Sequence, residues 1–177
     1  KEHERNELTY ARCIAMCMET RPDYCFEQHI SEMLDYGTTR VEVGIQTLSP
    51  KILEMIKRGH TIQDSIKATQ LLKDSFLKVT YHIMPGLYGS SVENDKHELK
   101  EIFDNPDYRP DSLKIYPCLV FKGTELHELW KNNSYKELCD YDVFALIKQL
   151  AGMSDEHPAI QLASRLQHRK MPKIFRL

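Results

Sequence analysis

Long apolar runs are missing from this chain of 177 residues. Its longest uninterrupted apolar stretch is only a few residues, whereas a transmembrane helix needs roughly 20, so we expect no membrane span. No charged and then apolar leader opens the chain, which predicts that it is not secreted. The first residue is Lys1 rather than Met, and this suggests that the natural N-terminus lies upstream.

A regular cysteine framework is missing as well. The five cysteines form an odd set, without the spacing of a disulfide scaffold. In the absence of a secretory leader, we expect reduced thiols and a cytoplasmic location.

Acidic residues are absent from the last part of the chain, residues 157–177. The same stretch is rich in basic residues, among them Arg165, Arg169, Lys170 and Lys173. Such a run predicts either a phosphate-binding face or a solvated helix surface or tail. The formal net charge of the whole chain is only −2, so nothing in the overall charge demands a nucleic-acid partner.

What is present is the composition of an ordinary globular domain. Hydrophobic residues make up 41% of the chain and charged residues 28%, which excludes a disordered or fibrous protein. The length predicts one domain or a large piece of one.

Strand-like and helix-like stretches alternate along the chain. β-branched residues and alternation predict strands at residues 11–18, 39–46, 77–84 and 112–116. Caps and a 3.6-residue period predict helices at residues 22–37, 50–57, 91–103, 124–131, 143–150 and 159–167, with another helix from residue 61 and a strand from residue 174. This order predicts an α/β fold in which parallel strands and crossover helices form part of a barrel.

Polar residues stand where the predicted strands end. In a parallel barrel, ligands bind at the C-terminal ends of the strands. That rule selects Glu19 and Arg21 after the first strand, Gln46 after the second, His82 near the end of the third and Tyr116 after the fourth.

Six segments, most of them at these strand ends, resemble the catalytic subunit of Elongator. They are ETRPDYC at 19–25, TRVEVGIQ at 39–46, KRGHT at 57–61, YHIMPGL at 81–87, YRPDSLKIYP at 108–117, and GTEL at 123–126 followed by LWK at 129–131. They follow the order of that family at nearly its spacing, over residues 12–136. Six segments in order make the resemblance specific.

The resemblance implies the C-terminal part of a (β/α)6-type partial TIM barrel of the radical S-adenosylmethionine (SAM) type. In that family a 4Fe–4S cluster cleaves SAM to a 5′-deoxyadenosyl radical, which is thought to activate acetyl-CoA. The resulting acetyl radical adds to C5 of the wobble uridine and gives a carboxymethyl-type product. The cofactors carry this chemistry, and the protein positions them and excludes water. The implied partners are the anticodon arm of tRNA, and either Elongator-type accessory subunits or a second copy of the chain.

By position, the resemblance assigns cofactor contacts to Glu19, Gln46, Arg58 and His82. The residue types suit that role, because a carboxylate can bind a ribose diol and a guanidinium can pair with a carboxylate. His82 also fits a core histidine with satisfied hydrogen bonds. Glu42 is expected to point away from its apolar neighbours and to form a structural ion pair.

Three further residues are expected to contact substrate or cofactor: Arg21, Lys114 and Tyr116. For Arg21 the alternative is an ion pair with a neighbouring carboxylate. No catalytic residue is assigned.

The three-cysteine motif that holds the cluster in this superfamily is missing. Cys13 and Cys17 have the spacing of its first two ligands, but Thr20 stands at the third position. In the family, the cluster ligands lie upstream of the strand that ends at Glu19. We also expect both cysteines on one side of the first strand, so we predict no metal ligand in this chain.

These points predict two parts. Residues 1–152 form a barrel segment that lacks the cluster-binding part, and residues 153–177 form a basic insertion or tail that leads towards a missing acetyltransferase-like domain. The basic tail residues named above are its candidate tRNA contacts. The chain alone is then expected to be inactive.

Two other functions are compatible with the sequence. One is a barrel that binds tRNA or partners without chemistry. The other is a different radical enzyme, such as a porphyrin-pathway oxidase or a methylthiotransferase, against which the segment at 108–117 argues.

Overall fold

The computed structural model describes residues 2–150 and contains a four-stranded parallel sheet in the order β1-β2-β3-β4. The strands are β1 (Cys17–Thr20), β2 (Arg40–Gln46), β3 (Lys78–Ile83) and β4 (Ser112–Ile115). All three neighbouring pairs are parallel. The α/β class and the partial barrel order are therefore confirmed.

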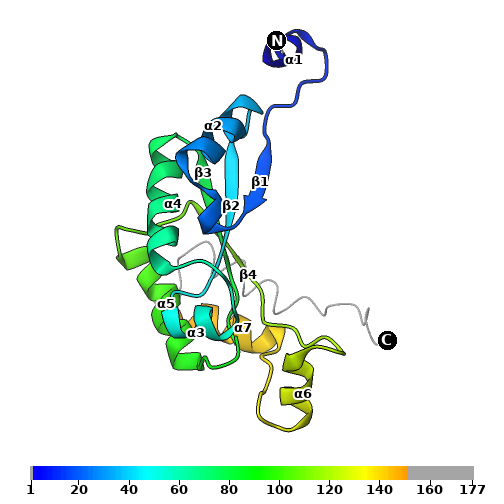
Figure 1. Ribbon diagram of the computed structural model, residues 1–177, viewed down its shortest axis with the longest axis vertical. Helices are drawn as coiled ribbons and strands as arrows, with labels where there is room; N and C mark the ends of the chain where they lie inside the picture. Colours follow the sequence, from blue (N-terminus) through cyan, green and yellow to red (C-terminus); the bar gives the residue numbers. More distant parts are fainter. Residues whose placement is uncertain (1, 151–177) are drawn as a thin grey trace.

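Helices connect the strands and also flank them. They are α1 (Glu2–Leu8), the 3-10 helix η1 (Pro22–Tyr24), α2 (Glu27–Asp35), α3 (Pro50–Met55), α4 (Ile62–Asp74), α5 (Val92–Asp104), α6 (Glu125–Lys131) and α7 (Asp140–Leu150). The crossover helices α2, α4 and α5 lie in a row along one side of the sheet (Figure 1). Within residues 2–150, no helix has both the length and the apolar character needed to cross a membrane.

The sheet has two different faces because side chains alternate along each strand. On the helix-covered face, the central strands bury apolar residues such as Val41, Val43 and Tyr81 against α4 and α5. On the opposite face, called the inner face below, polar side chains follow each other across the strands. Glu19 pairs with Glu42 in the β1–β2 register.

Local signals explain where the helices begin. Ser49 caps α3, which has Pro50 at its first position. At α4, the Asp64 carboxylate accepts the Thr61 N–H at 2.7 Å, and the Thr61 hydroxyl accepts the Asp64 N–H at 3.2 Å. This reciprocal capping box confirms the predicted start of the helix at residue 61.

The prediction of a strand over residues 11–18 was wrong. β1 begins only at Cys17, and Cys13 lies in the loop before it. The Asn6 side chain from α1 binds both backbone groups of Cys13, at 2.8 Å each. Because these groups are taken by a side chain, they do not join a sheet ladder. Cys13 and Cys17 therefore do not share a strand face.

Residues 151–177 lie outside the described part of the chain. The helix predicted at 159–167, the strand from residue 174 and the second predicted part, residues 153–177, fall there. So do the candidate tRNA contacts Arg165, Arg169, Lys170 and Lys173. These predictions remain untested.

Candidate functional site

His82 is the centre of the inner face. It comes from β3, and its side chain is only 4% exposed. Its Nε2 lies 2.8 Å from a Glu42 carboxylate oxygen on β2. Its Nδ1 lies 3.2 Å from the Tyr116 hydroxyl after β4 and 3.4 Å from the Glu19 carboxylate on β1. Side chains from β1, from β2 and from the residue after β4 therefore meet around the imidazole from β3.

Glu42 is the buried acidic member of this cluster. Its carboxylate is nearly buried and contacts the Lys114 ammonium as well as His82. The hydrogen bond from Lys114, and then that from His82, lowers the pKa of Glu42 to about 2, against the opposing effect of burial. The same contact with Glu42 raises the pKa of Lys114. The ion pair expected for Glu42 is confirmed.

A second group gathers around Gly44 on β2. Arg58, in the loop after α3, donates from Nη2 to the Gly44 carbonyl oxygen at 3.2 Å. A Cβ at Gly44 would lie 2.6 Å from that nitrogen and 3.1 Å from the Gln46 side-chain nitrogen. Both side chains therefore lie close over the Gly44 backbone, and any larger residue here would displace them.

Gln46 ends β2 in an unusual conformation. Its φ of 70° lies in the left-handed region, and the β2–β3 register shifts between Val43 and Gln46. Its Oε1 atom is buried, as is Arg58 Nε, and neither has a hydrogen-bond partner among residues 2–150. Buried polar atoms without partners are rare, and such atoms point to a site for a ligand or ordered water.

Arg21 belongs to the same end of the site. Its guanidinium pairs with Asp23, with Nε 2.9 Å from a carboxylate oxygen, and lies over the Tyr24 ring at 5.6 Å. The alternative of a neighbouring carboxylate partner is thus present in the structure. Burial, and next the nearby Arg21 charge, lower the pKa of Arg58, so two guanidinium groups share this end.

The inner face does not have the arrangement of a metal site. Among the described residues, Glu19, Glu42 and His82 bring potential ligand atoms within 4.8 Å of one another. However, the two carboxylates face different nitrogens of the imidazole, and the Lys114 ammonium already contacts the Glu42 oxygen nearest His82. The geometry is that of a hydrogen-bonded network.

Comparison with known families identifies the superfamily of the chain. Residues 2–102 match the radical SAM superfamily, and residues 110–170 match the radical SAM C-terminal domain. The chain belongs to the radical SAM superfamily.

Relatives confirm the resemblance to Elongator. The chain is 58% identical over 142 residues to the tRNA uridine(34) acetyltransferase of Methanocaldococcus jannaschii, covering 80% of this chain and 26% of that protein. It is 41% identical over 148 residues to human Elongator complex protein 3, covering 84% of this chain and 27% of that protein. The chain thus spans about a quarter of the length of these curated relatives.

Solved structures agree with this placement. The archaeal Methanocaldococcus infernus Elp3 with an N-terminal deletion matches with a TM-score of 0.78 and 54% identity, over 84% of this chain and 35% of that one. Coproporphyrinogen III oxidase from Escherichia coli, at 12% identity and a TM-score of 0.58 over 76% of this chain and 30% of that one, shares the fold alone.

The residues of this radical SAM chain fit SAM, the cofactor that the superfamily implies together with a 4Fe–4S cluster. In the Gly44 cradle, formed by the Arg58 and Gln46 side chains that lie over Gly44, the Gln46 acceptor Oε1 and the Arg58 donor Nε are both buried and unpaired among residues 2–150. At the other end, Glu19 offers an exposed carboxylate beside His82. A ligand with hydroxyl, carboxylate and ammonium groups matches this set of donors and acceptors.

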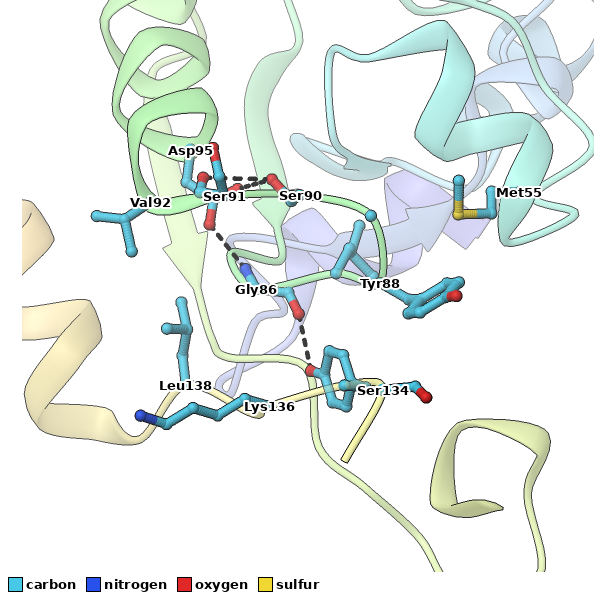
Figure 2. A pocket seen from close by; sticks show the side chains of 13 residues that line it. Met55, Gly86, Tyr88, Ser90, Ser91, Val92, Asp95, Ser134, Lys136 and Leu138 are labelled. Carbon is cyan, nitrogen blue, oxygen red and sulfur yellow. Dashed lines mark hydrogen bonds between the residues drawn. The ribbon is translucent and has the colours of Figure 1, made fainter. Parts of the chain in front are cut away.

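A separate hollow of about 490 Å³ lies beside the loop after β3 (Figure 2). Its buried carboxylate, Asp95, accepts the Gly86 N–H at 2.8 Å and the Ser90 hydroxyl at 2.6 Å. The Tyr135 hydroxyl donates to the Gly86 carbonyl oxygen at 2.8 Å. These bonds hold the loop after β3 in place, so the polar groups that line the hollow have a structural role.

Sequence reasoning missed two members of the site. Gly44 was part of a recognised segment but was given no role, although a glycine inside a predicted strand signals close approach. Glu42 was expected to form an ion pair, and its position between His82 and Lys114 was not foreseen. Side chains alternate between the two faces of a strand, and the observed register of β2, β3 and β4 places Glu42, His82 and Lys114 on one face.

Proposed function

We propose that this chain is the SAM-holding barrel segment of an enzyme that modifies the wobble uridine of tRNA by a radical reaction. The relatives named tRNA uridine(34) acetyltransferase and Elongator complex protein 3 support this substrate. The observation that carries the proposal is that Gln46 Oε1 and Arg58 Nε are buried without partners among residues 2–150, on the two side chains that lie over Gly44.

Each residue of the inner face has a role in this proposal. Glu19 accepts hydrogen bonds from the ribose hydroxyls, and His82 supports the same end. Arg58 pairs with the cofactor carboxylate, and Gln46 binds a neighbouring polar group. When bound with its cluster, SAM supplies the 5′-deoxyadenosyl radical. The protein orients it and keeps water away from it.

Arg21, Lys114 and Tyr116 border the same space and are proposed contacts for substrate or cofactor. Lys114 is half exposed, so its ammonium can meet a ligand on the open side while Glu42 holds it. The chemistry further requires acetyl-CoA and a 4Fe–4S cluster whose ligands lie upstream. The proposed location is the cytoplasm.

In this proposal the chain has two parts, the barrel segment of residues 1–152 and the basic stretch of residues 153–177 that follows it. The basic stretch contacts the tRNA. Phosphate contacts from Arg165, Arg169, Lys170 and Lys173 would give binding that weakens with salt. The anticodon arm offers unstacked bases for shape recognition. Elongator-type accessory subunits or a second copy of the chain are the proposed protein partners.

Mass spectrometry of tRNA nucleosides tests the proposal. Deleting the coding sequence in its host should remove carboxymethyl-type uridines from position 34, and the natural gene should restore them. Arg58→Ala should fail to restore them, whereas Ser91→Ala, which only weakens the cap of α5, should succeed. Unchanged tRNA in the deletion strain would refute the proposal. Rescue by Arg58→Ala would instead favour a binding module without chemistry.

A further inference from the structure

Glu42 occupies a position that the cofactor contacts proposed above do not use. It lies on β2, and its carboxylate contacts His82 on the neighbouring strand β3 and Lys114 on β4, the strand beyond. Its side chain is 12% exposed, whereas the side chain of Glu19 is 65% exposed. Glu42 therefore contacts other side chains inside the protein, whereas the Glu19 carboxylate is open to a ligand.

The hydrogen atoms of this network follow from the chemistry of the groups. The contact with Lys114 keeps the pKa of Glu42 near 2, so its carboxylate is ionised at neutral pH and only accepts hydrogen bonds. Its 2.8 Å contact with His82 Nε2 therefore requires a hydrogen on that nitrogen. Lys114 only donates, so it leaves this requirement unchanged.

In a neutral ring, the state of the other nitrogen then follows as well. A neutral imidazole protonated at Nε2 has its lone pair on Nδ1. The Tyr116 hydroxyl, 3.2 Å away, donates to that lone pair. The Glu19 carboxylate, at 3.4 Å, receives no hydrogen from it.

We propose that Glu42 is a positioning residue that fixes His82 in the tautomer protonated at Nε2, so that Nδ1 accepts the Tyr116 hydrogen and leaves the Tyr116 hydroxyl oxygen as an acceptor for the ligand. The Tyr116 oxygen and the Glu19 carboxylate then form a subsite that accepts two hydrogens. It fits a ligand group with two donors, such as a vicinal diol, and disfavours a group that only accepts. The choice of a nucleoside ribose as that diol rests on the proposed function, whereas the tautomer does not.

Nitrogen-15 NMR of the labelled 177-residue chain tests the tautomer directly. At pH 8, long-range proton–nitrogen correlations should show His82 protonated at Nε2 alone, with the signal assigned by its loss in His82→Gln. In Glu42→Leu the acceptor at Nε2 is gone, and the hydrogen should move to Nδ1, facing Glu19. In the matched control Glu19→Gln, the tautomer should stay unchanged. A wild-type ring protonated at Nδ1, or an unchanged ring in Glu42→Leu, would overturn the proposal.

Glu42→Gln provides a second measurement if the leucine variant does not fold. It keeps an acceptor for His82 on the same stem and removes the charge that faces Lys114. The pKa of Lys114, followed by NMR, should fall from its raised value towards the ordinary one. A pKa of Lys114 equal to that of the wild type would show that Glu42 does not hold these side chains.

Binding of nucleosides separates this inference from the proposed function. Adenosine should bind the wild-type chain at least fivefold more tightly than 2′,3′-dideoxyadenosine, and Glu42→Leu should abolish the difference. If the tautomer changes as expected but neither nucleoside binds, the proposed function fails and the positioning role stands. If adenosine is preferred equally by both proteins, the positioning role fails.

Discussion

Gly44→Ala tests the cradle that the Arg58 and Gln46 side chains form over Gly44. The new Cβ would lie 2.6 Å from Arg58 Nη2, whereas ordinary contacts are about 3.5 Å, so the guanidinium must retreat by roughly 1 Å. Gly44 does not have a positive φ, so alanine causes no backbone strain. The change therefore acts mainly on Arg58, through the loss of its bond to the Gly44 carbonyl oxygen, and also presses on the Gln46 side chain, 3.1 Å from the new Cβ.

The expected cost is small for folding and larger for binding. A hydrogen bond from a charged group contributes about 1.5–3 kcal/mol, and the gain from replacing glycine by alanine returns about 0.4–1 kcal/mol. We expect a net loss of about 1 kcal/mol in unfolding free energy, or about 3 °C in Tm. If the displaced Arg58 no longer pairs with the ligand carboxylate, Kd should rise roughly 10- to 100-fold.

Titration calorimetry with S-adenosylhomocysteine, together with thermal unfolding, measures both quantities. Ser91→Ala is the matched control, because it removes an N-cap worth about 1 kcal/mol at the start of α5 without touching the cradle. It should unfold like Gly44→Ala and bind like the wild type. Equal affinity of Gly44→Ala and the wild type would show that the Arg58 position does not serve the ligand.

Three further predictions concern stability and reactivity. The lowered pKa of Glu42 contributes at most about 3 kcal/mol to the free energy of unfolding, and about 1–2 kcal/mol with solvent screening. This contribution is present above pH 5 and is lost as the pH falls towards 2. In urea titrations, the stability advantage of the wild type over Glu42→Gln should therefore shrink over that window, and a constant difference would contradict this. Asp95→Ala should cost about 1.5–3 kcal/mol and speed hydrogen exchange in the loop after β3, whereas exposed Glu93→Ala in the same helical turn should do neither. Iodoacetamide at pH 8 should modify exposed Cys13 roughly a hundredfold or more faster than Cys25, because burial raises the pKa of the Cys25 thiol to about 12; equal rates by mass spectrometry would refute that burial.

The sequence predicted the fold well where local chemistry and tertiary packing agree. The capping box at Thr61 and the β-branched alternation of residues 39–46 set element boundaries within a residue of those observed. Residues 11–18 misled because the apolar run there resembles a strand, and nothing local shows that Asn6 binds Cys13. A contact between separate segments decided the outcome.

Several members of the site were predictable from the sequence, but their geometry was not. The rule of strand ends selected Glu19, Gln46 and His82, which the structure places on one face. It gave no sign that His82 takes three partners or that Glu42 supports it, because those contacts depend on side-chain directions across the sheet. Gly44 shows the same limit, since its importance comes from Arg58, fourteen residues further along the chain.

The two ends of the inner face differ in how far their polar groups are paired. Around Glu42, the described contacts give His82 and Lys114 partners within the protein, so this end is organised before any ligand arrives. Around Gly44, Gln46 Oε1 and Arg58 Nε are buried without partners among residues 2–150. Each such atom costs about 1–3 kcal/mol, which a ligand that pairs with it recovers. Affinity should therefore depend most on the Gly44 end, whereas substitutions at the Glu42 end should change which ligand groups are accepted.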